Sequence, residues 1–258
     1  MDMGGNATVV LVAVLAGFLV APVLNVLIDR VPSAAPLRGA REGEATVPMS
    51  WLGIPAQPWL LRAGRTAHGP LPRRWLAVEV VTVVAFAVMA VQYPSLELVA
   101  LLLLTASLIT VGVIDLQLLR IPDRITFPTL ALALPLVFAI SWYRDDLGSF
   151  KAGLAGSAGY FLLLLLPHLI YPRGMGFGDV KLALVMGLYL GWMGWTALYP
   201  LLGPMRLVLY ALMLGCAFGV VFGLVAQLIT RARGAFPFGP ALALGCYLVL
   251  LSAGSLRA

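Results

Sequence analysis

Residues 97–115 read ELVALLLLTASLITVGVID, in which one carboxylate is followed by seventeen uncharged and mostly apolar residues and then by a second carboxylate. A helix that crosses the hydrocarbon core of a bilayer needs about 20 predominantly apolar residues. Asp115 directly follows the apolar run Leu101–Ile114, so it falls where such a helix would reach the membrane surface. The stretch therefore predicts a transmembrane helix with an ionisable group at one end.

Composition extends this reading to the whole chain. Of the 258 residues, 61% are hydrophobic and 11% are charged, whereas a soluble domain carries about 25% charged residues. We expect an all-α fold: a polytopic transmembrane bundle of about eight spans, surrounded by membrane lipid. Residues 1–75 are expected to form an anchor helix and a cytoplasmic loop, and residues 76–258 the membrane-embedded bundle. The expected spans cover residues 8–28, 76–93, 97–115, 125–142, 152–171, 180–199, 205–229 and 238–255.

Small residues recur four apart in three of these spans. Ala152 and Gly156 lie in one span, Gly187 and Gly191 lie in another, and Gly215, Gly219 and Gly223 lie in a third. Such spacing lets helix backbones approach closely in lipid. We expect these residues to serve packing rather than chemistry.

The distribution of positive charge predicts the orientation. Residues 1–8 contain Asp2 but no Lys or Arg, and Arg30 follows the first apolar run, which indicates a retained anchor with its N-terminus outside. Four positive residues then lie outside: Arg144, Lys151, Arg206 and Arg257. Thirteen lie on the cytoplasmic side: Arg30, Arg38, Arg41, Arg62, Arg65, Arg73, Arg74, Arg120, Arg124, Arg173, Lys181, Arg231 and Arg233. Membrane topology thus explains the net charge of +6, and we expect no nucleic-acid partner.

Four of the eleven acidic residues fall at or inside apolar runs: Glu79, Asp115, Asp123 and Asp179. Ionisable groups in such places are costly and mark function by default. Asp115 and Asp179 are expected near the same membrane face. Two carboxylates brought close together cannot both ionise easily, and a pair that shares a proton suits peptide hydrolysis by water. These residues alone do not separate a hydrolase from a transporter that couples to protons or cations.

Other residues near the two aspartates have competing interpretations. Gly176 and Gly178 remove side chains beside Asp179, which would let an extended substrate backbone approach. Asp123 precedes an apolar run, so capping of the next helix is favoured over chemistry. Glu79 could form an ion pair with a nearby arginine, reach the membrane surface, or contact substrate. Lys181 could anchor its helix at the cytoplasmic surface or support the site.

Two longer stretches resemble the aspartate motifs of the type IV prepilin peptidases. Residues 114–123, IDLQLLRIPD, are similar to the first motif, and residues 174–182, GMGFGDVKL, are similar to the second, the GxGD signature. The likeness extends to residues 24–32, 72–79 and 236–240, and hence to nearly the whole chain. Transporters tend to place their ionisable groups near the bilayer midplane, at broken helices that recur between two halves, and this sequence shows no such pattern.

The resemblance implies a membrane aspartic endopeptidase, a hydrolase with Asp115 and Asp179 as its catalytic pair. Asp123, Lys181 and Glu79 would support the site or bind substrate. Members of the family remove the leader of type IV prepilins and of type II secretion pseudopilins at the cytoplasmic face of the bacterial inner membrane. The peptidase reaction needs no cofactor. Many members also methylate the new N-terminus with S-adenosylmethionine, which remains an open expectation for this chain.

The chain departs from the family in its first cytoplasmic loop. Long members often carry two CxxC pairs there that bind zinc, whereas residues 30–75 contain no cysteine and a single histidine, His68. A tetrahedral zinc site needs four such ligands. We therefore expect no zinc or other metal in this region. In the family, methylation is linked to this same loop, so the activity does not follow from the two aspartate motifs.

Overall fold

A computed structural model describes residues 3–32, 65–66, 69–70, 73–172, 175–196, 198, 202–230 and 237–255. Most of the predicted cytoplasmic loop lies outside these residues. The contacts divide the chain into two units, Met1–Leu98 and Val99–Ala258. The second predicted helix is thereby grouped with the first, and not with the helices after residue 98. The functional division at residues 75 and 76 stays a prediction.

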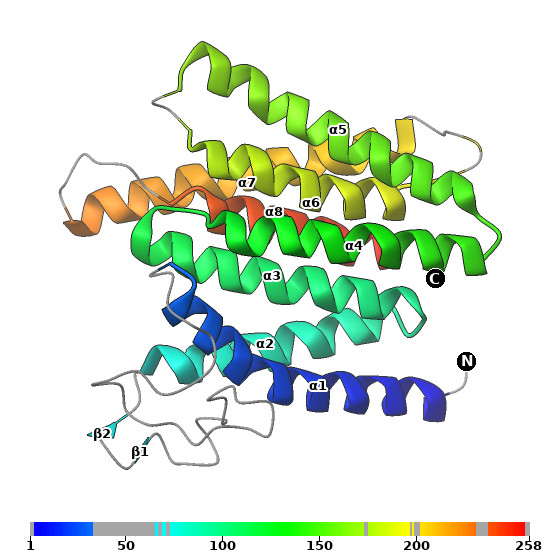
Figure 1. Cartoon of the computed structure of the whole chain (residues 1–258), viewed down its shortest axis with the longest axis horizontal. Helices are drawn as coiled ribbons and strands as arrows, with labels where there is room; N and C mark the ends of the chain where they lie inside the picture. Colours follow the sequence, from blue (N-terminus) through cyan, green and yellow to red (C-terminus); the bar gives the residue numbers. More distant parts are fainter. Residues whose placement is uncertain are drawn as a thin grey trace. The chain divides into compact units, whose positions relative to one another are not determined.

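The described residues of the first unit form two long helices and a small hairpin. Helix α1 (Met3–Arg30) packs against α2 (Arg73–Gln92), and between them in sequence β1 (Arg65–Thr66) pairs antiparallel with β2 (Gly69–Pro70) (Figure 1). The two helices approach closely at Gly17, where a Cβ would lie 3.0 Å from the Cα of Val83. A glycine is therefore needed at this crossing.

Polar side chains join the C-terminal end of α1 to the first residues of α2. The Asn25 amide donates to the carbonyl oxygen of Trp75 at 3.2 Å, and the Trp75 indole donates to Asp29 at 3.0 Å. Arg74 forms an ion pair with the same Asp29. These contacts fix the register of the helix pair at this end.

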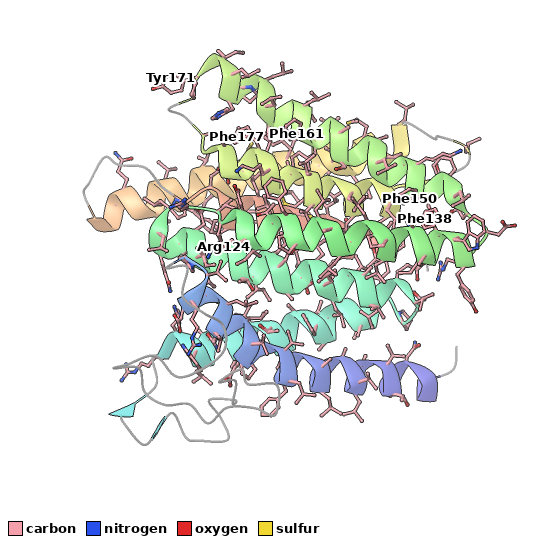
Figure 2. All side chains as sticks on the ribbon, viewed as in Figure 1. Arg124, Phe138, Phe150, Phe161, Tyr171 and Phe177 are labelled. Atoms are coloured by element: carbon pink, nitrogen blue, oxygen red, sulfur yellow. The ribbon has the colours of Figure 1, made fainter. Side chains whose placement is uncertain are left out.

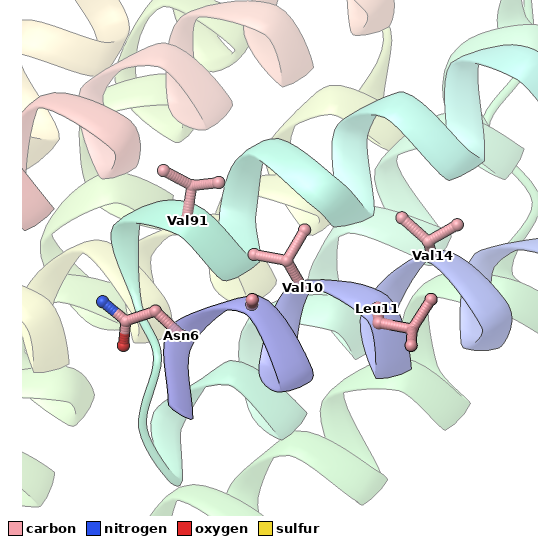
Figure 3. Close-up of a pocket in the computed structure, with 6 residues that line it drawn as sticks. Asn6, Val10, Leu11, Val14 and Val91 are labelled. Carbon is pink, nitrogen blue, oxygen red and sulfur yellow. The ribbon is translucent and has the colours of Figure 1, made fainter. Parts of the chain in front are cut away.

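A groove lies near the opposite end of the same helix pair. It encloses about 440 Å³ between α1 and α2 (Figure 3). Its lining is mostly apolar and contains no acidic residue, which suits contact with lipid chains. The lining residues are Asn6, Ala7, Val10, Leu11, Val14 and Val91.

The second unit contains most of the bundle. Helix α3 (Glu97–Leu118) begins at its border and is followed by α4 (Asp123–Tyr143), α5 (Leu147–Ile170), α6 (Phe177–Met193), α7 (Leu202–Thr230) and α8 (Gly239–Ser255). Within the described residues, six of the eight helices are long and apolar enough to cross a membrane, whereas α6 and α8 have 17 residues each. The chain is a polytopic helical membrane protein, as predicted.

Helices α5 and α6 lie side by side with their backbones in contact (Figure 1). A Cβ on Gly187 would lie 2.4 Å from the carbonyl oxygen of Gly156, and one on Gly191 would lie 2.3 Å from that of Ala152. The Ser157 hydroxyl also donates across the interface to the carbonyl oxygen of Leu184 at 2.8 Å. The packing role predicted for the small residues of α5 and α6 is confirmed.

Side chains tie the C-terminal end of α4 to neighbouring helices. At this end, Phe138 packs edge-on against Phe150 of α5, with ring centroids 5.3 Å apart (Figure 2). Close by, the Trp192 indole of α6 donates to Ser141 at 3.1 Å. Asp146 caps α5 by accepting from the Ser149 N–H at 3.2 Å, which starts this helix five residues before the predicted span. The aromatic contacts lie at the end of α4 opposite Asp123.

Candidate active site

Asp115 lies in the last turn of α3 and is 5% exposed. One of its carboxylate oxygens, Oδ2, accepts a hydrogen bond of 3.0 Å from the backbone N–H of Gly239, the first residue of α8. The first N–H groups of a helix have no partner within the helix, and the helix dipole favours an anion there. The start of α8 therefore orients the Asp115 carboxylate.

Asp179 lies in the first turn of α6 and is 6% exposed. The backbone of Gly176, the residue that precedes the helix, lies beside its carboxylate, because a Cβ there would be 3.4 Å from Oδ2. The Asp179 N–H donates to the carbonyl oxygen of Gly176 at 3.2 Å. The other carboxylate oxygen, Oδ1, is buried and has no hydrogen-bond partner among the described residues. That oxygen is left available for a water molecule or a substrate.

The structure brings the two aspartates to the same end of the second unit, close enough for their charges to interact. Ile121 lies between the start of α6, which carries Asp179, and the start of α8, which binds Asp115. A Cβ on Gly178 would lie 2.8 Å from Ile121 Cβ, and a Cβ on Gly239 would lie 3.2 Å from Ile121 Cδ1. The loop between α3 and α4 thus sets the spacing of the pair.

The two glycines before Asp179 have different surroundings. The space beside Gly178 is filled by Ile121, which gives this glycine a packing role, and its predicted part in substrate binding stays a prediction. Gly176 is exposed, and a Cβ there would lie 3.4 Å from Asp179 Oδ2. Substrate approach past Gly176 stays a prediction.

Asp123 does not cap α4, so the capping interpretation was wrong. The residue before the helix is Pro122, and no side-chain cap is present. Instead, Asp123 Oδ1 lies 2.5 Å from the Nζ of Lys181 in α6. The ammonium group of Lys181 also lies 5.1 Å from the ring centre of Phe177 and 5.7 Å from that of Phe127. Lys181 therefore connects the first turns of α4 and α6 beside the aspartates.

Glu79 belongs to α2 in the first unit and is 1% exposed, which excludes the interpretation that it reaches the membrane surface. Its neighbour Arg74 pairs with Asp29. The part predicted for Glu79 in substrate binding stays a prediction.

Metal ligands are scarce in this chain. Among the residues that the structure describes, no three His, Cys, Asp or Glu side chains are grouped as metal ligands would be. The loop in which relatives could hold zinc has no cysteine and falls largely outside the described residues. Its donor set does not fit a four-coordinate zinc ion, and the absence of a metal stays a prediction.

Sequence reasoning missed two contacts at the site. The Gly239 N–H is a backbone donor, and the only signal for it was the similarity of residues 236–240 to a family segment. His168, to which the sequence gave no role, places Nδ1 2.9 Å from the carbonyl oxygen of Met175. No sequence signal reports that contact, because any residue would present the same carbonyl group.

Comparison with known proteins agrees with the motifs. The sequence profile of the type IV leader peptidase family matches residues 102–224, a range that contains both aspartates. A prepilin leader peptidase/N-methyltransferase of Aeromonas salmonicida (strain A449) is 33% identical over 208 residues, 79% of this chain. Over both aspartate motifs, the chain is similar to the type IV leader peptidase family. The same name is carried by a Bacillus subtilis (strain 168) protein, 33% identical over 70% of this chain, and by a Neisseria gonorrhoeae protein, 32% identical over 78%.

The alignments cover only part of these leader peptidase relatives. They span 64% of the length of the Aeromonas protein and 66% of the Bacillus and Neisseria proteins. No solved structure matches the chain significantly. The similarity to this family therefore rests on the sequence, and the arrangement of the aspartates comes from the structure described above.

Proposed function

We propose that this chain is an aspartic endopeptidase that removes the leader of type IV prepilins or pseudopilins. One observation carries the proposal. Asp115 and Asp179, from two different helices, are both buried at one end of the bundle and near enough to interact. The Asp115 carboxylate is oriented by one backbone N–H, and the Oδ1 oxygen of Asp179 has no partner among the described residues.

This arrangement suits general acid–base hydrolysis. When two neighbouring carboxylates share one proton, the ionised member can take a proton from a water molecule that attacks the scissile carbonyl. The protonated member can donate to the carbonyl oxygen as negative charge develops on it. The Gly239 N–H holds the Asp115 carboxylate in place while the proton moves. Catalytic geometry is worth several kcal/mol when it is set before the reaction.

The substrate class is supported by the relatives, whose names include prepilin leader peptidase. The charge bias supports a cytoplasmic position for the site in a bacterial inner membrane, with the N-terminus of the chain outside. The proposed peptidase uses no cofactor. N-methylation with S-adenosylmethionine is a second candidate activity, favoured by the N-methyltransferase part of the relatives' names. A coupled transporter has no support from the family match.

The test compares three Asp→Asn variants of the full chain in membranes. Asp115→Asn and Asp179→Asn are expected to abolish cleavage of a purified prepilin while leaving the protein in the membrane. Asp146→Asn is the matched control, because asparagine also caps helices and Asp146 lies at the start of α5, away from the pair. Full cleavage by either of the first two variants would refute the catalytic assignment.

The same reactions can report on methylation when they are run with and without S-adenosylmethionine. Loss of the leader mass measures the peptidase, and a gain of one methyl group on the mature chain measures the second activity. Cleavage without methyl transfer would restrict this chain to the first reaction. Proton or cation uptake into liposomes that depends on both aspartates, together with no cleavage, would favour the transporter.

A further inference from the structure

His168 contacts the segment that leads into Asp179. It lies in the last turn of α5, and its Nδ1 atom is 2.9 Å from the carbonyl oxygen of Met175. A carbonyl oxygen can only accept, so Nδ1 must carry the proton in this contact. The hydrogen bond therefore ties the end of α5 to the residue just before Gly176.

The segment held by His168 leads directly into the first turn of α6. Gly176 follows Met175, and its carbonyl oxygen accepts from the Asp179 N–H at 3.2 Å. A Cβ at Gly176 would lie 3.4 Å from Asp179 Oδ2, so the same residue also lies beside the carboxylate. A shift of Met175 would move Gly176 and, with it, the backbone that holds Asp179.

The residues of the segment 175–179 do little by themselves to fix its backbone conformation. Gly176 and Gly178 flank Phe177, and glycine gives the backbone more freedom than any other residue. Fixation must then come from neighbouring side chains. His168 provides one such contact through the Met175 carbonyl, and its ring also packs against Phe177 with centroids 5.3 Å apart.

Phe177 links this contact to a second one. Its ring lies 5.1 Å from Lys181 Nζ, and Lys181 pairs with Asp123 at the start of α4. Phe177 lies at the start of α6, beside the end of α5, which the labelled Tyr171 follows (Figure 2). The start of α6 is thus held from α5 on one hand and from α4 on the other.

We propose that His168 is a positioning residue for the peptidase reaction, which fixes the orientation of Asp179 by donating from Nδ1 to the Met175 carbonyl. The inference rests on the proposed function for its kinetic consequence, but the contact itself can be tested separately. A misplacement of a catalytic group by about 1 Å can cost about 100-fold in rate. Loss of the donor is therefore expected to lower kcat and to change KM little.

Two substitutions separate the hydrogen bond from the ring contact. His168→Asn retains a donor, because the asparagine side-chain nitrogen occupies about the position of Nδ1, and it removes the ring. His168→Phe retains a ring and removes the donor. We expect the Phe variant to lose at least about 10-fold in kcat for prepilin cleavage, with KM within about 3-fold, and the Asn variant to stay within about 3-fold of the unaltered protein in both.

A second readout does not need activity. Hydrogen–deuterium exchange of the backbone amides in residues 175–179 should be faster in His168→Phe than in His168→Asn, whereas exchange in the distant α4–α5 turn should be equal. If His168→Phe does not accumulate in the membrane, His168→Ala takes its place as the variant without a donor. Equal exchange and equal kcat in the donor and no-donor variants would overturn the proposal. Absence of cleavage by the unaltered protein, with the expected exchange difference present, would instead overturn the proposed function.

Discussion

Substitution of Gly239 by alanine tests whether the start of α8 orients Asp115. The added Cβ would lie 2.9 Å from Asp115 Oδ2 and 3.2 Å from Ile121 Cδ1, so the carboxylate must move by several tenths of an ångström or more. The 3.0 Å hydrogen bond from Gly239 N–H would then be lost or bent. A hydrogen bond to a charged group is worth about 1.5–3 kcal/mol. If that energy holds the reactive geometry, kcat should fall about 10- to 100-fold.

The assay is the rate of prepilin cleavage by purified protein in detergent or lipid, with thermal unfolding measured on the same preparations. Gly112→Ala is a matched control in α3, because a Cβ there meets only the Cα of Pro240, at 3.8 Å, which is ordinary contact. We expect Gly112→Ala to retain the rate and the unfolding temperature of the unaltered protein. If Gly239→Ala cleaves as fast as Gly112→Ala, the start of α8 does not control the reactivity of Asp115.

Three further predictions concern stability and are checked by thermal unfolding in detergent. Gly187→Val should destabilise the fold by more than about 2 kcal/mol or prevent its accumulation, because the α5–α6 backbones leave no space beside Gly156; unchanged stability would contradict the described packing. Leu119 has φ 52°, a conformation that costs a side-chain-bearing residue roughly 1–2 kcal/mol, so Leu119→Gly should keep or raise the unfolding temperature. Lys181→Met should cost only about 1 kcal/mol, since its partner Asp123 is 52% exposed; a loss several times larger would show that the contact with Asp123 holds α4 and α6 together.

The helices and the pair of aspartates could be predicted because both depend on patterns local in the chain. An apolar run that ends in Asp115, and another that begins after Asp179, place the two residues at helix ends whatever the tertiary structure. Positive charges then assign those ends to one face. The small residues of α5 and α6 were also readable, since a spacing of four places them on one helix face.

The contacts that orient the site could not be predicted in the same way. The interpretation of Asp123 as a cap used only its neighbours in sequence, and the structure shows that Lys181, 58 residues later, holds its carboxylate instead. Gly178 suggested room for a substrate, but Ile121 from another segment fills that space. His168 has a backbone carbonyl as its partner. In each case the contact partner lies in another segment of the chain, and the spacing of residues in the sequence does not show that the two are neighbours.

Asp115 receives its orienting hydrogen bond from the main chain, from the N–H of Gly239. Every amino acid except proline offers such an N–H, so a substitution at this position does not remove the donor itself but changes the volume beside the carboxylate. An added side chain displaces the carboxylate from the donor, and a larger one displaces it further. An engineer who wishes to alter the reactivity of Asp115 without that of Asp179 could therefore vary the size of the residue at 239 step by step.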